Sequence, residues 1–552
     1  MAADTVIRGG TVIDGTGAPG RLADVAVTQG RISAIGEGLT GDRVLDAGGC
    51  IVAPGFIDIH THYDAQVFWD PALTPSCFHG VTTVVGGNCG FSIAPTLPEH
   101  RDTIAATLQK VEDMDIATLA AGIPWDFQTF PEYLASIERR GTVLNYNAYI
   151  GHTALRFFVL GIEGSRRAAT SEEIERMSEI VREAMRAGAV GFATTFAGTH
   201  VGADGRPVAS RNANREEFEA LCHAVGEMGR GVVGVTPGEH LDLAELYELQ
   251  PKVGRPFTYT ALLTFPGVDY RAQVELNDKG RARGADVWPQ VSPRPLTFQM
   301  TMTDPFMFNV TDSFRELMAG TKAERLQAYS DPAWRNRAKA DLGAGIIPPR
   351  WETYRIAESE MHRDLIGQPV SDLAAQRGVD PLDLVLELAV AEDLATRFGC
   401  VIANDDVEGV AFLLQQDGVV LGLSDAGAHV GQLCDAPQAT DLLGNWVRDR
   451  DLMPIEKAVR KLTGEPADIF GFSGRGYLRE GACADIAVFD PDTVGPGPVR
   501  RVRDFPADGE RLTADAPTGM NHVLVNGTPI RVAGESLHDK LDSLPGQIAR
   551  VE

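Results

Sequence analysis

The middle of the chain alternates short apolar segments with longer amphipathic ones, and this alternation restricts the fold more than any other feature. Each apolar segment is followed by a loop, and most loops lead into a run with helical periodicity, which is typical of parallel βα units. The eight candidate strands are 55–62, 81–88, 144–152, 190–195, 231–237, 257–263, 285–293 and 419–425. Eight such units predict a (β/α)8 barrel of the TIM-like kind, and a doubly wound open sheet is the alternative.

One connection is too long for a simple crossover. Residues 294–418 separate the last two candidate strands, and the run 314–342 within them has helical character. We therefore predict a helical insertion over about 294–400, before the last barrel strand, which could serve as a lid. Among the ordinary crossover helices, the run 171–189 opens with Ser171, which we expect to cap its N-terminus.

The two ends of the chain share a different pattern. Short β-branched runs separated by glycine turns fill residues 1–53 and return in residues 474–552, as in small antiparallel sheets. We predict a small β-sandwich domain formed from both termini, with residues 54–473 forming the barrel and its insertion.

Charge and cysteine usage exclude some partners. The formal net charge is −26, and because nucleic-acid affinity depends on Lys and Arg displacing counterions, nucleic acid and anionic membranes are poor partners. No run resembles a signal peptide or a membrane span. Seven cysteines, an odd number without paired spacing, favour a reducing compartment. We expect a cytoplasmic protein that acts on a small molecule, and the sequence is also compatible with a homo-oligomer.

The first strand ends in two histidines. His60 and His62 are two residues apart in GFIDIHTH, so their side chains leave the same face of the strand. In a barrel the chemistry lies at the carboxyl ends of the strands, and Asp425 ends the eighth strand, which closes against the first. Two imidazoles beside a carboxylate match the ligands of a divalent metal, most simply zinc. A histidine pair of this kind also occurs without a metal, as ordinary buried or surface side chains.

Longer motifs carry a resemblance to a known family. They are PGFIDIHTHYDAQ (54–66), VTTVVGGNCGFSIAP (81–95), YIGHTALR (149–156), LGLSDAGAH (421–429), KLTGEPADIFG (461–471) and GRGYLREGACADIAVFDPDTV (474–494). Together they resemble the amidohydrolase superfamily, and more closely its N-acyl-D-amino-acid deacylase (D-aminoacylase) branch. The resemblance runs from end to end, although it is thin from about 196 to 400.

The resemblance implies a distorted barrel with a small β-sandwich, and it implies site roles. It makes His60 and His62 metal ligands and Asp425 both ligand and general base. It also implies that Cys89 replaces the carboxylated lysine that many superfamily members use, and no lysine lies between Lys110 and Lys252. A nearby cation stabilises a thiolate, whereas the alternative for Cys89 is a buried apolar side chain.

The resemblance breaks at two strand ends. Members of the branch carry histidines at the ends of the fifth and sixth strands, where this chain has Thr236 and either Ala261 or Leu262. We therefore expect one metal ion per chain. The branch's substrate-binding lysine after the paired histidines and its seventh-strand tyrosine are missing too, so the substrate need not be a simple N-acyl-D-amino acid.

Five further residues are candidates for contacts with substrate or with the ligands. Tyr63 and Asp64 follow the histidine pair directly, and we expect Asp64 to hold a histidine tautomer. His152 ends the third strand, and we expect it or His429 to donate a hydrogen bond to the substrate, although capping a helix or supporting a ligand is an equal alternative for His429. Arg294 either binds an anion or caps a surface loop.

These residues favour a metal-dependent hydrolase that cleaves a linear amide (C–N) bond, with a metal-activated water and Asp425 as general base. The alternatives are a lactone, ester or cyclic-amide hydrolase on the same site, because the same water attacks each of these carbonyls. A non-catalytic metal-binding protein on this fold is the second alternative.

Overall fold

The computed structural model describes residues 3–202, 205–309, 311–318, 320–345 and 348–552. The chain divides into two compact units. The barrel unit comprises the chain up to Arg294 together with Asp406–Glu552, and the insertion unit is Pro295–Asp405.

Eight parallel strands of the described chain form the central sheet of the barrel unit, in the order β16-β12-β11-β10-β9-β8-β7-β6. They are β6 (Phe56–Asp58), β7 (Val81–Gly86), β8 (Asn145–Gly151), β9 (Gly191–Thr195), β10 (Val232–Thr236), β11 (Phe257–Tyr259), β12 (Val287–Val291) and β16 (Val420–Leu421). The end strands approach each other through a parallel bridge between Thr61 and Ala426. This pairing confirms the barrel and rules out the open sheet.

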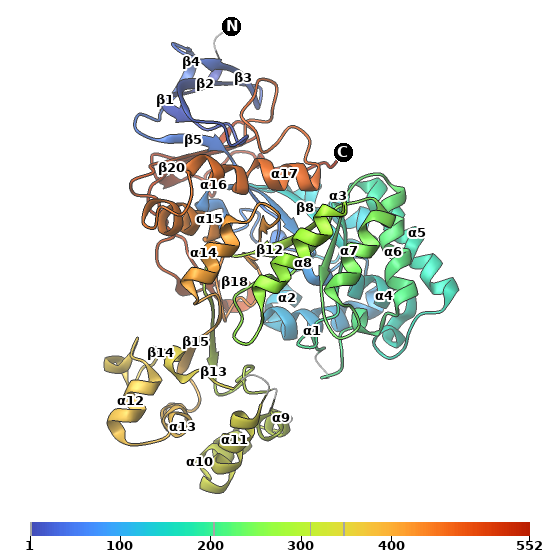
Figure 1. Cartoon of the computed structure of the whole chain (residues 1–552), viewed down its shortest axis with the longest axis vertical. Helices are drawn as coiled ribbons and strands as arrows, with labels where there is room; N and C mark the ends of the chain where they lie inside the picture. Colours follow the sequence, from blue (N-terminus) through green and yellow to red (C-terminus); the bar gives the residue numbers. More distant parts are fainter. Residues whose placement is uncertain (1–2, 203–204, 310, 319, 346–347) are drawn as a thin grey trace. The chain divides into compact units, whose positions relative to one another are not determined.

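Helices cover the outside of these strands (Figure 1). The helices of the barrel unit are α1 (Arg101–Glu112), α2 (Ile116–Gly122), α3 (Phe130–Arg140), α4 (His152–Leu160), α5 (Ser171–Ala187), α6 (Arg215–Glu227), α7 (Leu243–Val253), α8 (Tyr270–Ala282), α14 (Val407–Gln415), α15 (Gln438–Asp441), α16 (Ile455–Leu462) and α17 (Gly464–Phe470). The cap of α5 is Thr170 and not Ser171, because the Thr170 side chain and Glu173 form a reciprocal capping box.

Burial explains why the strands are short and apolar. All residues of β8 and β9 are buried, including the amides Asn145 and Asn147. Asn147 donates to the carbonyl oxygens of Gly188 and Ala549, so its polar group is satisfied inside the core. One face of each strand packs on helices and the other fills the barrel, which requires nearly continuous apolar segments.

Both termini contribute to one further sheet. Its nine strands in the described chain are β1 (Ala3–Val12), β2 (Arg21–Thr28), β3 (Arg31–Gly36), β4 (Gly41–Asp46), β5 (Ile51–Pro54), β17 (Ile486–Phe489), β20 (Met520–Val525), β21 (Thr528–Val532) and β22 (Glu535–Ser536). The two halves join where β5 pairs antiparallel with β17 through Val52 and Val488. This sheet confirms that the ends of the chain build one small β domain beside the barrel. The hairpin of β18 (Arg500–Phe505) and β19 (Gly509–Thr513) follows β17.

The insertion unit is a small α/β body. Its antiparallel sheet has the order β13-β15-β14, with β13 (Leu296–Thr301), β14 (Arg355–Glu358) and β15 (Arg397–Ala403). Its helices are α9 (Asp312–Met318), α10 (Lys322–Ser330), α11 (Pro332–Ala344), α12 (Val370–Arg377) and α13 (Pro381–Ala391). Within the described residues of the whole chain, no helix is long and apolar enough to cross a membrane.

Candidate metal centre

Two imidazoles meet where the first barrel strand ends. The chain continues beyond β6 alongside β7, because Thr61 N donates to Val85 O (3.0 Å). His60 and His62 therefore leave the same side, and their Nε2 atoms lie 3.4 Å apart. Their side chains are 1% and 5% exposed, so they form a buried pair of nitrogen donors.

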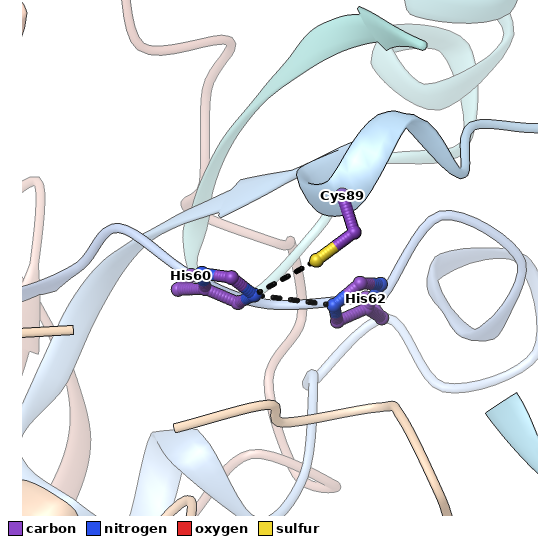
Figure 2. A group of neighbouring side chains, drawn as sticks. All are labelled: His60, His62 and Cys89. Atoms are coloured by element: carbon purple, nitrogen blue, oxygen red, sulfur yellow. Dashed lines mark hydrogen bonds between the residues drawn. The ribbon is translucent and has the colours of Figure 1, made fainter. Parts of the chain in front are cut away.

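Cys89 joins this pair from the turn after the second strand. It lies in the short helix η3 (Asn88–Gly90) with a left-handed backbone (φ 54°), and its Sγ is 3.7 Å from His60 Nε2. Figure 2 shows the sulfur and the two facing ring nitrogens directed at one another. Burial opposes ionisation of the thiol, but the neighbouring His60 and His62 lower the pKa of Cys89 to about 7.

Asp425 closes the group from the eighth strand. Its Oδ1 lies 3.0 Å from His60 Nε2 and 3.8 Å from His62 Nε2, and Ser424 Oγ donates to His60 O (2.9 Å), which ties the two strand ends together. Burial opposes the charge of Asp425, but His60 holds the pKa of this carboxyl well below its usual value.

These atoms could hold a divalent metal. The donor atoms of His60, His62 and Cys89 all lie within 4.8 Å of one another, and within the described residues no other group of three or more His, Cys, Asp or Glu donors meets this criterion. Two nitrogens, a sulfur and a carboxylate oxygen are a zinc-type donor set. Burial disfavours a charged His60 ring, yet Asp425 and Cys89 raise the pKa of His60 to about 10, so the group favours positive charge at its centre.

The outer nitrogen of each imidazole has a partner. His60 Nδ1 is 2.7 Å from Gln290 Oε1 on β12. The Gln290 amide is oriented by its own donation to Thr258 Oγ1 (3.1 Å), so the oxygen faces His60. In the neutral ring that binds a metal, Nδ1 then carries the proton and the Nε2 lone pair faces the group.

Glu112 is the corresponding partner of the outer nitrogen of His62. Its Oε1 lies 3.1 Å from His62 Nδ1, and both side chains are buried. Burial opposes ionisation of Glu112, but His62 lowers the pKa of this carboxyl. Sequence reasoning missed both partners. Gln290 could have been found as a polar residue inside the seventh strand, whereas Glu112, at the end of α1, carries no local signal.

Asp64 does not take the role expected of it. Its Oδ2 accepts from Gly87 N (2.8 Å), so it braces the turn that leads to Cys89, and the contacts to the imidazole rings come from Gln290 and Glu112 instead. Tyr63 lies beside it, fully buried, with its hydroxyl 2.8 Å from Ser76 Oγ.

His152 faces away from the group. Its Nδ1 is 2.8 Å from Thr194 Oγ1 and its Nε2 is 2.8 Å from Glu217 Oε1. Glu217 also pairs with Arg156, and His152, Glu217 and Arg156 are each 0% exposed. Both ring nitrogens are therefore engaged in a buried network between β9 and the helices, and the structure shows His152 in this network and not beside the metal centre.

Arg294 has carboxylate partners. Its Nε is 2.8 Å from Asp435 Oδ1 and its Nη1 is 3.3 Å from Asp441 Oδ1. Its charge is already matched by two buried acids, so an anionic ligand would have to displace them.

Hydroxyls occupy the ends of the fifth and sixth strands. Thr236 ends β10 and pairs in register with Thr195 of β9. After β11, the side chain beside His60 is Thr260, with its Oγ1 3.4 Å from His60 Nδ1. Thr260 lies one residue before Ala261 and two before Leu262, the two residues expected at this position.

Two further histidines flank the group. His429 is half-buried, four residues after Asp425, and burial lowers its pKa, against the charges of Glu112 and Asp425. His200, missed by sequence reasoning, lies on the loop after β9, where its Nδ1 is 2.7 Å from Thr195 Oγ1. Burial lowers the pKa of His200 to about 4. Its position five residues past a predicted strand end was the available signal.

Comparisons with known proteins identify the family of this chain. The sequence model described as "Amidohydrolase family" matches residues 43–531. The chain is 31% identical over 540 residues to the D-aminoacylase of Alcaligenes xylosoxydans xylosoxydans, covering 96% of this chain and 94% of that one. It is 30% identical over 569 residues to the N-acyl-D-glutamate deacylase of the same organism, covering 99% and 96%.

Solved structures show the same similarity. A crystal structure of D-aminoacylase matches with a TM-score of 0.68 and 26% identity, covering 99% of this chain and 100% of that one. The N-acyl-D-glutamate deacylase from Bordetella bronchiseptica, complexed with zinc and a phosphonate inhibitor, matches with a TM-score of 0.67 and 28% identity, with full coverage of both chains (100% each). A D-hydantoinase, at 14% identity and a TM-score of 0.52, shares the fold.

Proposed function

Because the chain belongs to the amidohydrolase family, in its D-aminoacylase-like branch, we propose that this enzyme is a metal-dependent deacylase that hydrolyses the linear amide bond of a small N-acylated substrate. One observation carries the proposal. The donor atoms of His60, His62 and Cys89 lie within 4.8 Å of one another, and Asp425 adds a carboxylate oxygen 3.0 Å from His60 Nε2 and 3.8 Å from His62 Nε2.

The proposed ligands are these four side chains, holding one divalent ion, most simply zinc. When bound, such an ion lowers the pKa of a coordinated water and polarises the substrate carbonyl. The single ion is supported by Thr236 and Thr260 at the ends of the fifth and sixth strands, because a neutral hydroxyl is a poorer ligand than an imidazole.

Asp425 is the proposed general base. A carboxylate oxygen accepts a proton from the attacking water and passes it to the amide nitrogen as the C–N bond breaks. Two features support this role. His60 keeps the pKa of Asp425 low against the effect of burial, so the group is ionised, and its side chain is 18% exposed, the most accessible of the side chains that form the ion pairs of this centre.

The remaining residues hold or flank these groups. We propose that His429 contacts the substrate, that Gln290 and Glu112 set the tautomers of His60 and His62, and that Asp64 braces the turn before Cys89. A cytoplasmic location is also proposed, supported by all seven cysteines being unpaired.

The test is a hydrolysis screen of the purified protein, loaded with zinc, against N-acyl-D- and N-acyl-L-amino acids, aryl amides, lactones, esters and hydantoins. The expected result is metal-dependent release of amine from linear amides. Turnover confined to lactones, esters or cyclic amides would show that the enzyme is a hydrolase of those compounds and not a linear-amide deacylase. One bound metal with no turnover of any compound would support the non-catalytic alternative.

Asp425→Asn tests the general base. We expect it to fold normally by circular dichroism and to lose about 10²–10⁴-fold in kcat. Asp278→Asn, on the exposed face of α8, is the matched control and should behave as wild type. Substantial activity in Asp425→Asn would show that Asp425 is not the general base.

A further inference from the structure

His200 is held firmly although it lies on a loop. Its N–H donates to Ala197 O (3.1 Å), and its own carbonyl oxygen accepts from Val208 N (3.4 Å) and from Arg211 Nη1 (3.1 Å). The position of the ring is thus set by the backbone on both sides of it.

The ring lies on the barrel side of β9. Neighbouring residues of a strand face opposite ways, and Thr194 faces the helices, where it contacts His152. Thr195 must then face the barrel interior, and it is Thr195 that holds His200 Nδ1.

The ring also lies close to the turn that carries Cys89. The ring centroids of His200 and Phe91, two residues after Cys89, are 5.1 Å apart in an edge-on contact. In addition, the charges of Glu112, His62 and Asp425 all act on the His200 ring. The imidazole of His200 therefore packs beside the turn that carries Cys89, within electrostatic range of the metal centre.

The hydrogen bonds of Thr195 determine which ring nitrogen carries the proton. Thr195 is 0% exposed, and its Oγ1 accepts from Ala197 N (3.1 Å). The hydroxyl proton needs an acceptor, because a buried donor without a partner is costly. The acceptor within reach is His200 Nδ1. Thr195 therefore donates to Nδ1, and a neutral His200 carries its proton on Nε2.

We propose that His200 is a catalytic residue whose Nε2–H donates a hydrogen bond to the acyl carbonyl oxygen of the substrate. This inference rests on the proposed function. As water oxygen bonds to the carbonyl carbon, the π electron pair of the C=O bond moves onto the carbonyl oxygen, and the Nε2–H stabilises that charge without transferring its proton. When the C–N bond breaks, the pair returns to re-form C=O. A donor already positioned for developing charge is worth about 10²–10³-fold in kcat.

The same hydrogen bonds argue against two other roles. With the proton on Nε2, His200 has no lone pair there to accept a proton as a general base. As a metal ligand it would need a lone pair on Nε2, but with Nδ1 accepting from Thr195 Oγ1, Nε2 carries the proton.

Three variants test the proposal, with the exposed His223→Ala on α6 as the matched control. His200→Ala should lower kcat by about 10²–10³-fold while metal affinity, measured by competition with a chelator, changes less than twofold. His200→Gln should recover part of the loss, because its amide N–H reaches towards the Nε2 position. Thr195→Val should also lower kcat, because the ring is then free to adopt the other tautomer.

Two readouts do not depend on turnover. ¹⁵N NMR of the imidazoles should show His200 as the Nε2–H tautomer in wild type, and a phosphonate analogue of the tetrahedral intermediate should bind His200→Ala at least tenfold more weakly. The proposal is overturned by an Nδ1–H tautomer, by unchanged kcat and analogue binding, or by a tenfold loss of metal affinity in His200→Ala. If wild type hydrolyses no amide, the proposed function fails, and analogue binding and the tautomer still decide the role of His200.

Discussion

The two imidazoles of the metal centre are oriented by different acceptors. Gln290 presents a neutral amide oxygen to His60 and Glu112 presents a carboxylate to His62. The Gln290 oxygen holds the His60 proton on Nδ1, and the Glu112 carboxylate, 3.1 Å from His62 Nδ1, favours the same tautomer there, which leaves Nε2 as the donor atom for a metal. The carboxylate also adds negative charge one layer outside the ligands, so Glu112 should raise the affinity for a cation more than Gln290 does.

Glu112→Ala should lower the affinity for zinc by about 10–100-fold, because His62 loses the acceptor that fixes its ring. Glu112→Gln should lose less, since its amide oxygen still accepts from Nδ1–H. Chelator competition measures both, and Glu138→Ala on the exposed face of α3 is the control. Wild-type affinity in Glu112→Ala would show that the His62 ring is held by its packing alone.

At the scale of elements, the turn between β7 and η3 places Cys89. Gly87 there has φ +74°, and a Cβ on it would lie 2.3 Å from Tyr149 O. Its N–H donates to Asp64. The turn is thus fixed from both sides, and only glycine fits between the two strands.

Gly87→Ala should therefore move η3 and lower zinc affinity, in addition to the cost of about 1–2 kcal/mol for a left-handed alanine. Gly284→Ala is the matched control, because Gly284 also has positive φ (+91°) but open space around its Cβ position. It therefore introduces the same backbone strain without a steric clash. It should lose stability and keep zinc affinity. Equal zinc affinity in both variants would mean that the turn does not position Cys89.

Other elements show how sequence patterns translate into structure. All eight candidate strands are present, because burial on both faces demands apolar segments that are visible in the sequence. Their ends are less predictable. The sixth strand is only Phe257–Tyr259, and the side chain directed at His60 is Thr260, one or two residues earlier than expected.

At the scale of the whole molecule, His79 connects three distant parts of the chain. It ends η2 (Ser76–His79), and its ring nitrogens lie 2.8 Å from Thr440 Oγ1 and 2.7 Å from Ala514 O. The ring is 0% exposed, and burial lowers the pKa of His79 to about 3. The folded protein therefore keeps this imidazole neutral at pH values where the unfolded chain would protonate it.

His79 should make stability depend on pH. Above pH about 6.5 the ring is neutral in both the folded and the unfolded state, so this group does not make the free energy of unfolding depend on pH. Between about 6.5 and 3 only the unfolded chain binds it, so stability falls as pH falls, by about 1.4 kcal/mol per pH unit for this group. Urea unfolding at pH 7.5 and 5.5 should show a smaller drop for His79→Gln than for wild type or for the exposed His223→Gln. Equal drops would contradict this assignment.

Several features were determined by the sequence alone. The strand and helix periodicities predicted the barrel and the sheet built from both ends, because burial imposes these patterns residue by residue. The placement of His60, His62 and Asp425 at strand ends followed from the same reasoning, because the carboxyl ends of parallel strands share one rim.

Only the tertiary structure decided what surrounds these residues. It brought Glu112 from α1, Gln290 from β12 and His200 from a loop to the metal centre, and it turned His152 and Arg294 towards buried carboxylates. These contacts join residues far apart in the chain. Their geometry depends on how helices and loops pack around the barrel, and no local periodicity records that packing.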